Sequence, residues 1–109
     1  MIPQTAKFSI GDAVRHRIFD FRGVIYDVDP VFSNTDEWYE SIPEDVRPSK
    51  DQPFYHLFAE SVEHAPYIAY VSQQNLVFDD DPDPIAHPDL EEYFEGITEG
   101  LFIPKQKAN

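Results

Sequence analysis

Apolar and polar residues alternate in two short runs near the start of the chain, over residues 14–18 and 24–28. This period of two is typical of β-strands, and the short segment 19–21 between the runs predicts a tight turn. Pro30 has no backbone N–H to donate, so it keeps the second run from continuing as an inner strand. The pattern therefore predicts a β-hairpin over residues 11–30 with its turn centred on Asp20.

The position of this turn determines which side chains of the hairpin face a core. With Asp20 at the centre, even-numbered residues share one face and odd-numbered residues share the other. The face predicted to be buried comprises Val14, His16, Ile18, Val24, Tyr26 and Val28. The opposite face comprises Ala13, Arg15, Arg17, Ile25, Asp27 and Asp29. On this register Asp27 lies diagonally across from Arg15, where the two side chains can form an ion pair.

Further strands are predicted on both sides of the hairpin. Residues 8–10 read as a short strand that leads into it, and residues 53–60 form an aromatic-rich strand with bulky side chains on both faces. Residues 67–72 predict a third strong strand, and residues 73–78 a turn followed by a last short strand. Four or five short antiparallel strands favour a mainly β fold, a small SH3-like antiparallel β-barrel with a long inserted loop.

The inserted loop covers residues 31–52, which are rich in proline and polar side chains. A short helical turn is predicted around residues 36–41. Trp38, the only tryptophan of the chain, lies in this loop beside Tyr39. An aromatic ring in a polar loop either pins the loop to the core or is an exposed contact with a partner, and the sequence favours pinning because isolated aromatic rings mostly find local burial.

The end of the chain is predicted to form a separate unit, so we divide the chain into a barrel at residues 1–78 and a tail at residues 79–109. The tail starts with an acidic, proline-rich linker. A two-turn helix is then expected from Pro88 to a stop at Gly96. Its apolar residues Leu90, Tyr93, Phe94 and Ile97 recur at helical spacing.

The apolar face of this short C-terminal α-helix needs a surface to pack on, because so short a helix is marginal by itself. Residues 101–104 form a further apolar patch that suits an edge strand. The sequence leaves open whether the tail packs on its own barrel or on a neighbouring subunit, and Phe94, Ile97 and Phe102 make a homo-oligomer the expectation.

Charge is distributed unevenly along the chain, and this limits the plausible partners. The 109 residues carry a net charge of −13, yet acidic and basic residues balance over residues 1–35. The stretch from Asp79 to Glu99 holds nine acidic residues and no basic one. A chain with this net charge repels the phosphate backbone of DNA at long range. Any contact with DNA must therefore be made by a small group of basic residues at short range. The simpler interpretation of the acidity is solubility.

No constellation of residues indicates catalysis, a cofactor or a metal. The chain has no cysteine and none of the common nucleotide-binding, hydrolase or metalloprotease motifs. The histidines His16, His56, His64 and His87 lack ligand spacing, and the acidic run 79–83 lacks the glycine and distal glutamate of a calcium loop. We expect no enzymatic activity and no bound metal. The start of the chain lacks a leader pattern and no run is long enough to span a bilayer, so a cytoplasmic location without membrane contact is expected.

Basic residues near the hairpin are the one feature that suggests nucleic acid. The candidate DNA-binding residues are Lys7, Arg15, Arg17 and Arg22. Arginine grips phosphates and reads guanine edges. Ordinary cross-strand ion pairing accounts equally well for part of this cluster.

The runs FSIGDAVRHRIFDFRGVIYDVDPVF, PFYHLFAE and YVSQQNL, in this order, resemble the HspQ family, also called the hemimethylated-DNA-binding or YccV-like domain. The tail resembles the longer alphaproteobacterial type. The resemblance implies a small barrel-like β fold, a heat-shock connection, self-association and no enzymatic activity. It also implies two binding activities, a preference for hemimethylated DNA and a role as specificity factor for the Lon protease.

Between these two activities the sequence favours the adaptor for Lon and its substrates, with hemimethylated DNA as the alternative partner. DNA binding needs a positive surface, whereas an adaptor needs exposed loops and apolar contact surface. This acidic chain supplies the loops and apolar surface more readily. The candidate protein-binding residues are Trp38, Tyr39, Tyr93, Phe94, Ile97 and Phe102.

Overall fold

The computed structural model describes residues 4–61, 65–81, 85–98 and 101–105. Two helices, two 3₁₀ turns and seven strands follow one another in this order: β1 (Ala13–His16), β2 (Arg22–Asp29), α1 (Asp36–Glu40), η1 (Glu44–Val46), β3 (Phe54–Glu60), β4 (Tyr67–Ser72), η2 (Gln73–Asn75), β5 (Leu76–Phe78), α2 (Leu90–Tyr93), β6 (Phe94–Thr98) and β7 (Leu101–Pro104). None of the helices in these ranges is long and apolar enough to cross a bilayer.

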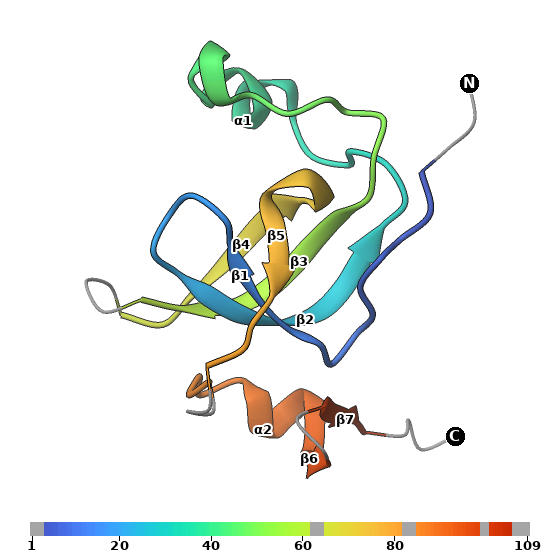
Figure 1. Ribbon diagram of the computed structural model, residues 1–109, viewed down its shortest axis with the longest axis vertical. Coiled ribbons are helices and arrows are strands. Elements are labelled where there is room, and N and C mark those ends of the chain that lie inside the picture. Colours follow the sequence, from blue (N-terminus) through green and yellow to red (C-terminus); the bar gives the residue numbers. More distant parts are fainter. Residues whose placement is uncertain (1–3, 62–64, 82–84, 99–100, 106–109) are drawn as a thin grey trace.

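Strands β1 to β5 form one antiparallel sheet in the order β4-β3-β2-β1-β5, and β6 pairs with β7 in a second, two-stranded sheet. The predicted mainly β, antiparallel fold is confirmed, since the chain meanders from β1 to β4 and β5 then returns beside β1. Strands β4 and β5 form the two edges of the described sheet. Figure 1 shows α1 near one end of this curved sheet and the tail, with α2, β6 and β7, at the opposite end.

The predicted register of the hairpin is wrong by three residues. Ala13 lies opposite Val24 and Val14 opposite Gly23, so the ladder ends before the predicted turn. The backbone N–H groups of Ile18 and Phe19 donate instead to the His16 side chain, and that of Arg17 donates to the Asn75 carbonyl, which makes this connection a wide loop. Ile18 is consequently 56% exposed although the pattern placed it in the core.

Strand β2 is buried on both faces, which the simple alternation also missed. Ile25 was placed opposite the core residues, yet it is fully buried in the same cluster as Val14. Val24 points to the other face and joins the second cluster. A bulge at Tyr26 shifts the pairing with β3, so the alternation changes phase within the strand.

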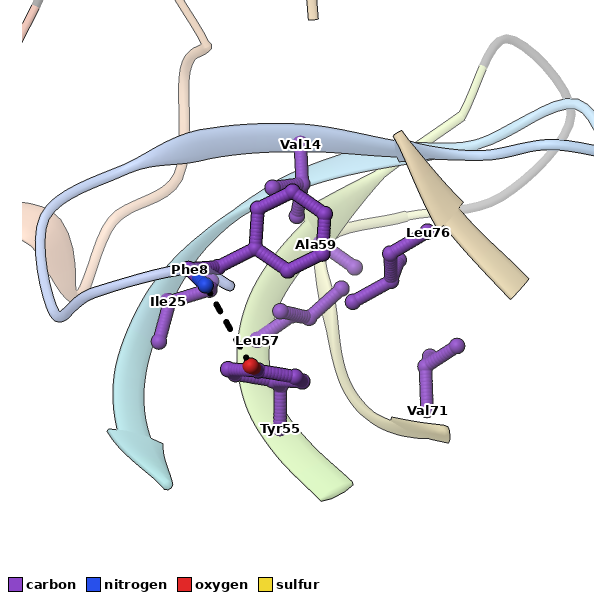
Figure 2. Close-up of a cluster of buried hydrophobic side chains, with 8 residues drawn as sticks. All are labelled: Phe8, Val14, Ile25, Tyr55, Leu57, Ala59, Val71 and Leu76. Atoms are coloured by element: carbon purple, nitrogen blue, oxygen red, sulfur yellow. Dashed lines mark hydrogen bonds between the residues drawn. The ribbon is translucent and has the colours of Figure 1, made fainter. Parts of the chain in front are cut away.

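The first hydrophobic cluster fills the inside of the curved sheet (Figure 2). Its members are Phe8, Val14, Ile25, Tyr55, Leu57, Ala59, Val71 and Leu76. Residues 8–10 are not a strand, contrary to the prediction. Phe8 instead packs into the first cluster, and its backbone N–H donates a hydrogen bond to the Tyr55 hydroxyl at 3.3 Å. Ser9 and Asp12 exchange two hydrogen bonds that turn the chain before β1.

The second cluster lies on the outer face and joins the tail to the barrel. Its members are Val24, Phe58, Ile85, Leu90, Phe94 and Phe102. In this structure the tail therefore packs on the sheet of its own chain. Burial of Ile85 within the predicted linker adds a contact that the acidic composition concealed.

The predicted two-turn helix is one turn long. It ends at Tyr93 because Phe94 is extended and begins β6, which pairs with the predicted edge strand β7. This pairing buries Phe94 and Phe102 together, with ring centroids 5.7 Å apart. Ile97 lies on the strand and is 49% exposed, so the helical face drawn through Leu90 and Ile97 does not exist.

Gly11 makes the close contact that docks the tail. Its φ of +98° is a conformation that side chains disfavour, and a Cβ there would lie 2.1 Å from the Phe102 carbonyl oxygen. Its N–H donates to the Ile25 carbonyl and its own carbonyl accepts from the Phe102 N–H at 3.0 Å. One residue thus connects β2 with β7.

The long loop contains the predicted helical turn, α1, whose N-terminus is capped by the Thr35 hydroxyl. Trp38 is half-buried and its ring lies 5.9 Å from Phe32 and 5.3 Å from Tyr70. Since Tyr70 belongs to β4, these contacts hold the loop against the sheet, as the pinning interpretation predicts.

Candidate binding site

The loop of residues 17–21, between β1 and β2, is organised by the His16 side chain. The imidazole Nδ1 accepts hydrogen bonds from the backbone N–H groups of Ile18 at 3.1 Å and Phe19 at 3.0 Å. The ring is buried and stacks on Phe19 at 4.7 Å and lies 5.1 Å from Phe21. The burial predicted for this histidine is confirmed.

His16 accepts both hydrogen bonds only in its neutral form, because a protonated Nδ1 is a donor. Burial lowers the pKa of His16 from its ordinary value, and the nearby Arg17 charge lowers it further. The neutral imidazole thus stabilises the loop through these two hydrogen bonds, and burial of the ring favours the neutral form.

One side of this loop borders an open cleft of about 890 Å³. It is lined by the continuous segment Arg15 to Arg22 and by Glu60, Ser61 and Asp79 to Asp81. Five acidic side chains thus face three arginines in the cleft. This balance gives the cleft no positive surplus that would attract phosphate.

Arg22 is committed to an internal ion-pair network. Its guanidinium lies 2.8 Å from Asp79, 3.4 Å from Asp81 and 3.7 Å from Glu60. The Asp79 side chain is only 3% exposed, and that of Arg22 is 18% exposed. Arg22 therefore ties β2 to β3 and to the start of the tail, and it is a poor candidate for DNA contact.

The other three predicted DNA-binding residues, Lys7, Arg15 and Arg17, are exposed. Arg15 lies opposite Arg22, not diagonal to Asp27, because of the shifted register. Asp27 lies opposite His56 on β3. The ion pair predicted between Arg15 and Asp27 is thus ruled out by the strand pairing, and Arg15 and Arg17 make no ion pair with the described residues.

The opposite side of the loop borders an apolar groove of about 270 Å³. Most of its lining comes from three segments, namely the loop itself, the α1–η1 segment and the edge strand β4, and single residues of β1, β3 and η2 complete it. The groove is lined by His16, Ile18, Phe19, Phe21, Trp38, Ile42, Val46, Pro48, Phe54, Tyr67, Ala69, Tyr70, Val71, Ser72 and Asn75. None of these side chains is a carboxylate, an ammonium or a guanidinium, although the chain has 21 acidic residues.

The six predicted protein-binding residues separate into three groups. Trp38 lines the groove, whereas Tyr39 is outside its lining and its hydroxyl donates to the Pro48 carbonyl at 2.6 Å. Tyr93 of α2 and Ile97 of β6 are exposed, and Figure 1 shows both elements at the end of the molecule opposite to α1. Phe94 and Phe102 are 4% and 6% exposed, so their assignment to a partner surface is wrong, because both are used in the chain's own core.

Sequence reasoning missed most of the groove because its walls come from three separate segments. Ile42, Val46 and Ser72 attract no attention in the sequence. One signal was present, since Trp38, Ile42 and Val46 recur every four residues along the otherwise polar loop.

A polar cluster of Asp27, Asp29 and His56 lies on the outer face of β2 and β3, with candidate ligand atoms within 4.8 Å of one another. Within this cluster, Asp29 and His56 interact with each other, and Asp29 also binds Tyr70. The Asp29 carboxylate accepts from the Tyr70 hydroxyl at 2.8 Å and contacts His56 Nε2 at 3.0 Å. Burial raises the pKa of Tyr70 well above its ordinary value, and the Asp29 carboxylate adds to this effect, so Tyr70 remains a donor.

The protein is thus a small antiparallel β domain in which the 17–21 loop borders two hollows, the cleft and the apolar groove. Domains of this class are known from a protein family. The model of the family "Hemimethylated DNA-binding protein YccV like" matches residues 6–101, and the chain belongs to that family.

Longer proteins contain a similar segment. F-box only protein 21 of Mus musculus, of Pongo abelii and of Homo sapiens is 32% identical to this chain over 98 residues. The match covers 89% of this chain and 15% of each relative, so the chain spans less than one sixth of the length of these relatives.

Proposed function

We propose that the chain is a non-enzymatic protein-binding module that acts as a specificity factor for a Lon-type protease. One observation carries this proposal. The exposed apolar side chains of the 17–21 loop border a formed apolar groove, whereas the basic residues do not make a continuous positive surface. A groove of this kind is suited to capture a segment of another protein.

The test is a degradation assay with purified Lon protease and a fluorescent model substrate. Adding the protein is expected to raise the degradation rate of that substrate, while the protein without Lon leaves the substrate intact. An unchanged rate over a range of protein concentrations would refute the adaptor role. Cleavage of the substrate by the protein itself would refute the non-enzymatic part.

Hemimethylated DNA is the second candidate partner. The family membership supports it, as does the exposure of Arg15 and Arg17 without a carboxylate partner in the described structure. Such a contact would be local, because the net charge of −13 opposes phosphate binding at long range.

Titration of hemimethylated, fully methylated and unmethylated duplexes at low salt tests this second function. Arg15→Glu and Arg17→Glu, each made singly, are expected to abolish the preference. Lys105→Glu is the matched control, since it makes the same charge change at an exposed residue in the tail. Equal affinity of the wild-type protein for all three duplexes would exclude methylation-specific binding.

A further inference from the structure

The apolar groove follows the edge of the sheet, and this determines the shape of what it can hold. A groove on one face of a strand is lined by alternate residues, because successive side chains point to opposite faces. Here four consecutive residues of β4, from Ala69 to Ser72, line the groove. The hollow therefore runs along the outer side of β4, where the edge strand has no neighbour among the described strands.

Backbone groups on the outer side of an edge strand can pair with an added extended segment. Ser72 supplies a further polar group at this place. It is 2% exposed, and its hydroxyl has no hydrogen-bond partner among the described residues. A buried hydroxyl without a partner is costly, and a ligand that bonds to it recovers that cost.

The size and lining of the groove define the side chain that it accepts. A volume of about 270 Å³ lies just below the roughly 300–1,000 Å³ of small-molecule sites, and suits a bulky apolar side chain. Trp38, Phe19 and Tyr67 supply aromatic surface. The uncharged lining would penalise a charged group inserted between them.

The charge around the groove defines the residues that flank such a side chain. The segment of residues 36–51, which provides one wall, carries six acidic and two basic residues. Arg47 and Lys50 are engaged within this segment, Arg47 with the Ile42 carbonyl and Lys50 with Asp36. Together with the net charge of −13, this surplus attracts cationic segments.

We infer that the groove binds an extended peptide segment in which a bulky apolar side chain is flanked by lysine or arginine. The segment adds to the edge of β4, inserts its apolar side chain beside Trp38 and places its basic residues near the acidic wall. This inference rests on the proposed protein-binding function and names the class of segment that it recognises.

The test uses the full chain and a short labelled peptide with a phenylalanine–leucine–phenylalanine centre and two lysines at each end. Fluorescence anisotropy measures its affinity, and the emission of Trp38, the only tryptophan, reports whether it occupies the groove. Two control peptides replace the lysines by glutamates or the central residues by serines. Both controls are expected to bind at least tenfold more weakly, and binding of the lysine peptide is expected to weaken with salt.

Two variants locate the site. Ile18→Lys introduces a cation at the groove, while Ile68→Lys makes the same change at a β4 residue that is 51% exposed and outside the lining. Because Ile18 is itself 56% exposed, both variants are expected to fold, which a thermal melt verifies. Only Ile18→Lys is expected to weaken binding of the lysine peptide by tenfold or more. Ser72→Ala is expected to weaken it by about two- to tenfold without loss of stability.

Several results would overturn the inference. They are equal affinity for the lysine and glutamate peptides, equal effects of Ile18→Lys and Ile68→Lys, or no change in Trp38 emission on binding. A dimer that Ile18→Lys dissociates, with no peptide binding, would assign the groove to a second copy of the chain instead.

If Lon stimulation persists while the lysine peptide does not bind, the recognised segment is wrong and the adaptor function stands. If the lysine peptide binds but Lon is not stimulated, the adaptor function fails and the groove assignment stands.

Discussion

The attachment of the tail to the barrel is tested by replacing Phe102 with alanine. Phe102 is 6% exposed and packs with Phe94, Val24 and Phe58 in the second cluster. Truncating a buried phenylalanine loses the transfer free energy of the ring and leaves a cavity, which together cost about 3–5 kcal/mol. Since domains of this size are stable by about 5–15 kcal/mol, Phe102→Ala is expected to remove a large part of the free energy of unfolding.

Urea unfolding followed by circular dichroism measures this loss. Ile97→Ala is the matched control, because Ile97 lies on β6 and is 49% exposed, so its change is expected to stay within about 0.5 kcal/mol. A loss for Phe102→Ala no larger than that of the control would refute packing of the tail on the barrel. A loss that depends on protein concentration would show that the tail packs on a second copy instead.

Three further predictions concern single contacts. Gly11→Ala is expected to cost about 2 kcal/mol or more in urea unfolding, because its Cβ meets the Phe102 carbonyl and φ is positive; an unchanged midpoint would contradict this geometry. Asp79→Asn is expected to cost about 1–3 kcal/mol through Arg22, an effect that unfolding at several salt concentrations separates from surface charge; equal stability would mean that the pair contributes nothing. His16 binds fewer protons in the folded than in the unfolded state just below pH 6.5, since its pKa is lowered from that value, so stability is expected to fall as the pH drops through this range. The slope should be smaller in His16→Asn, and equal slopes would exclude His16 as the cause.

The strands that were predicted well are those whose local pattern agrees with their environment. Residues 53–60 became β3, with Tyr55 and Leu57 in one cluster and Phe58 in the other, as bulk on both faces predicted. Strands β4 and β5 and the 3₁₀ turn between them also lie where the sequence placed them. In β3 and β4, β-branched or aromatic residues such as Tyr55, Phe58 and Val71 fill positions that the curved sheet buries, and in β5 the buried residue is Leu76.

The hairpin register failed because a side chain, rather than the backbone alone, forms the connection. Alternation fixes a face only after the turn length is known, and a shift of one residue exchanges the faces. His16 supplies the acceptor for two backbone N–H groups, which makes a wide loop as favourable as a tight turn. A histidine with an apolar pattern around it gives no sign of this role.

The C-terminal prediction failed for a different reason. Leu90, Tyr93, Phe94 and Ile97 have helical spacing, yet isolated short helices are marginal and tertiary contacts decide their length. Pairing of Phe94 with Pro104 and insertion of Phe102 into the second cluster bury both phenylalanines, whereas Ile97 stays exposed on β6. Tertiary packing therefore overrode local propensity.

The acidic character of the chain and its basic hairpin are compatible because the arginines have different uses. Arg22 forms ion pairs with carboxylates of β3 and of residues 79–81, so its charge stabilises the fold and does not contribute to a positive surface. Arg15 and Arg17 remain on the cleft side of the 17–21 loop, while Ile18 and Phe19 border both hollows. A ligand in either hollow thus contacts a loop whose shape depends on neutral His16.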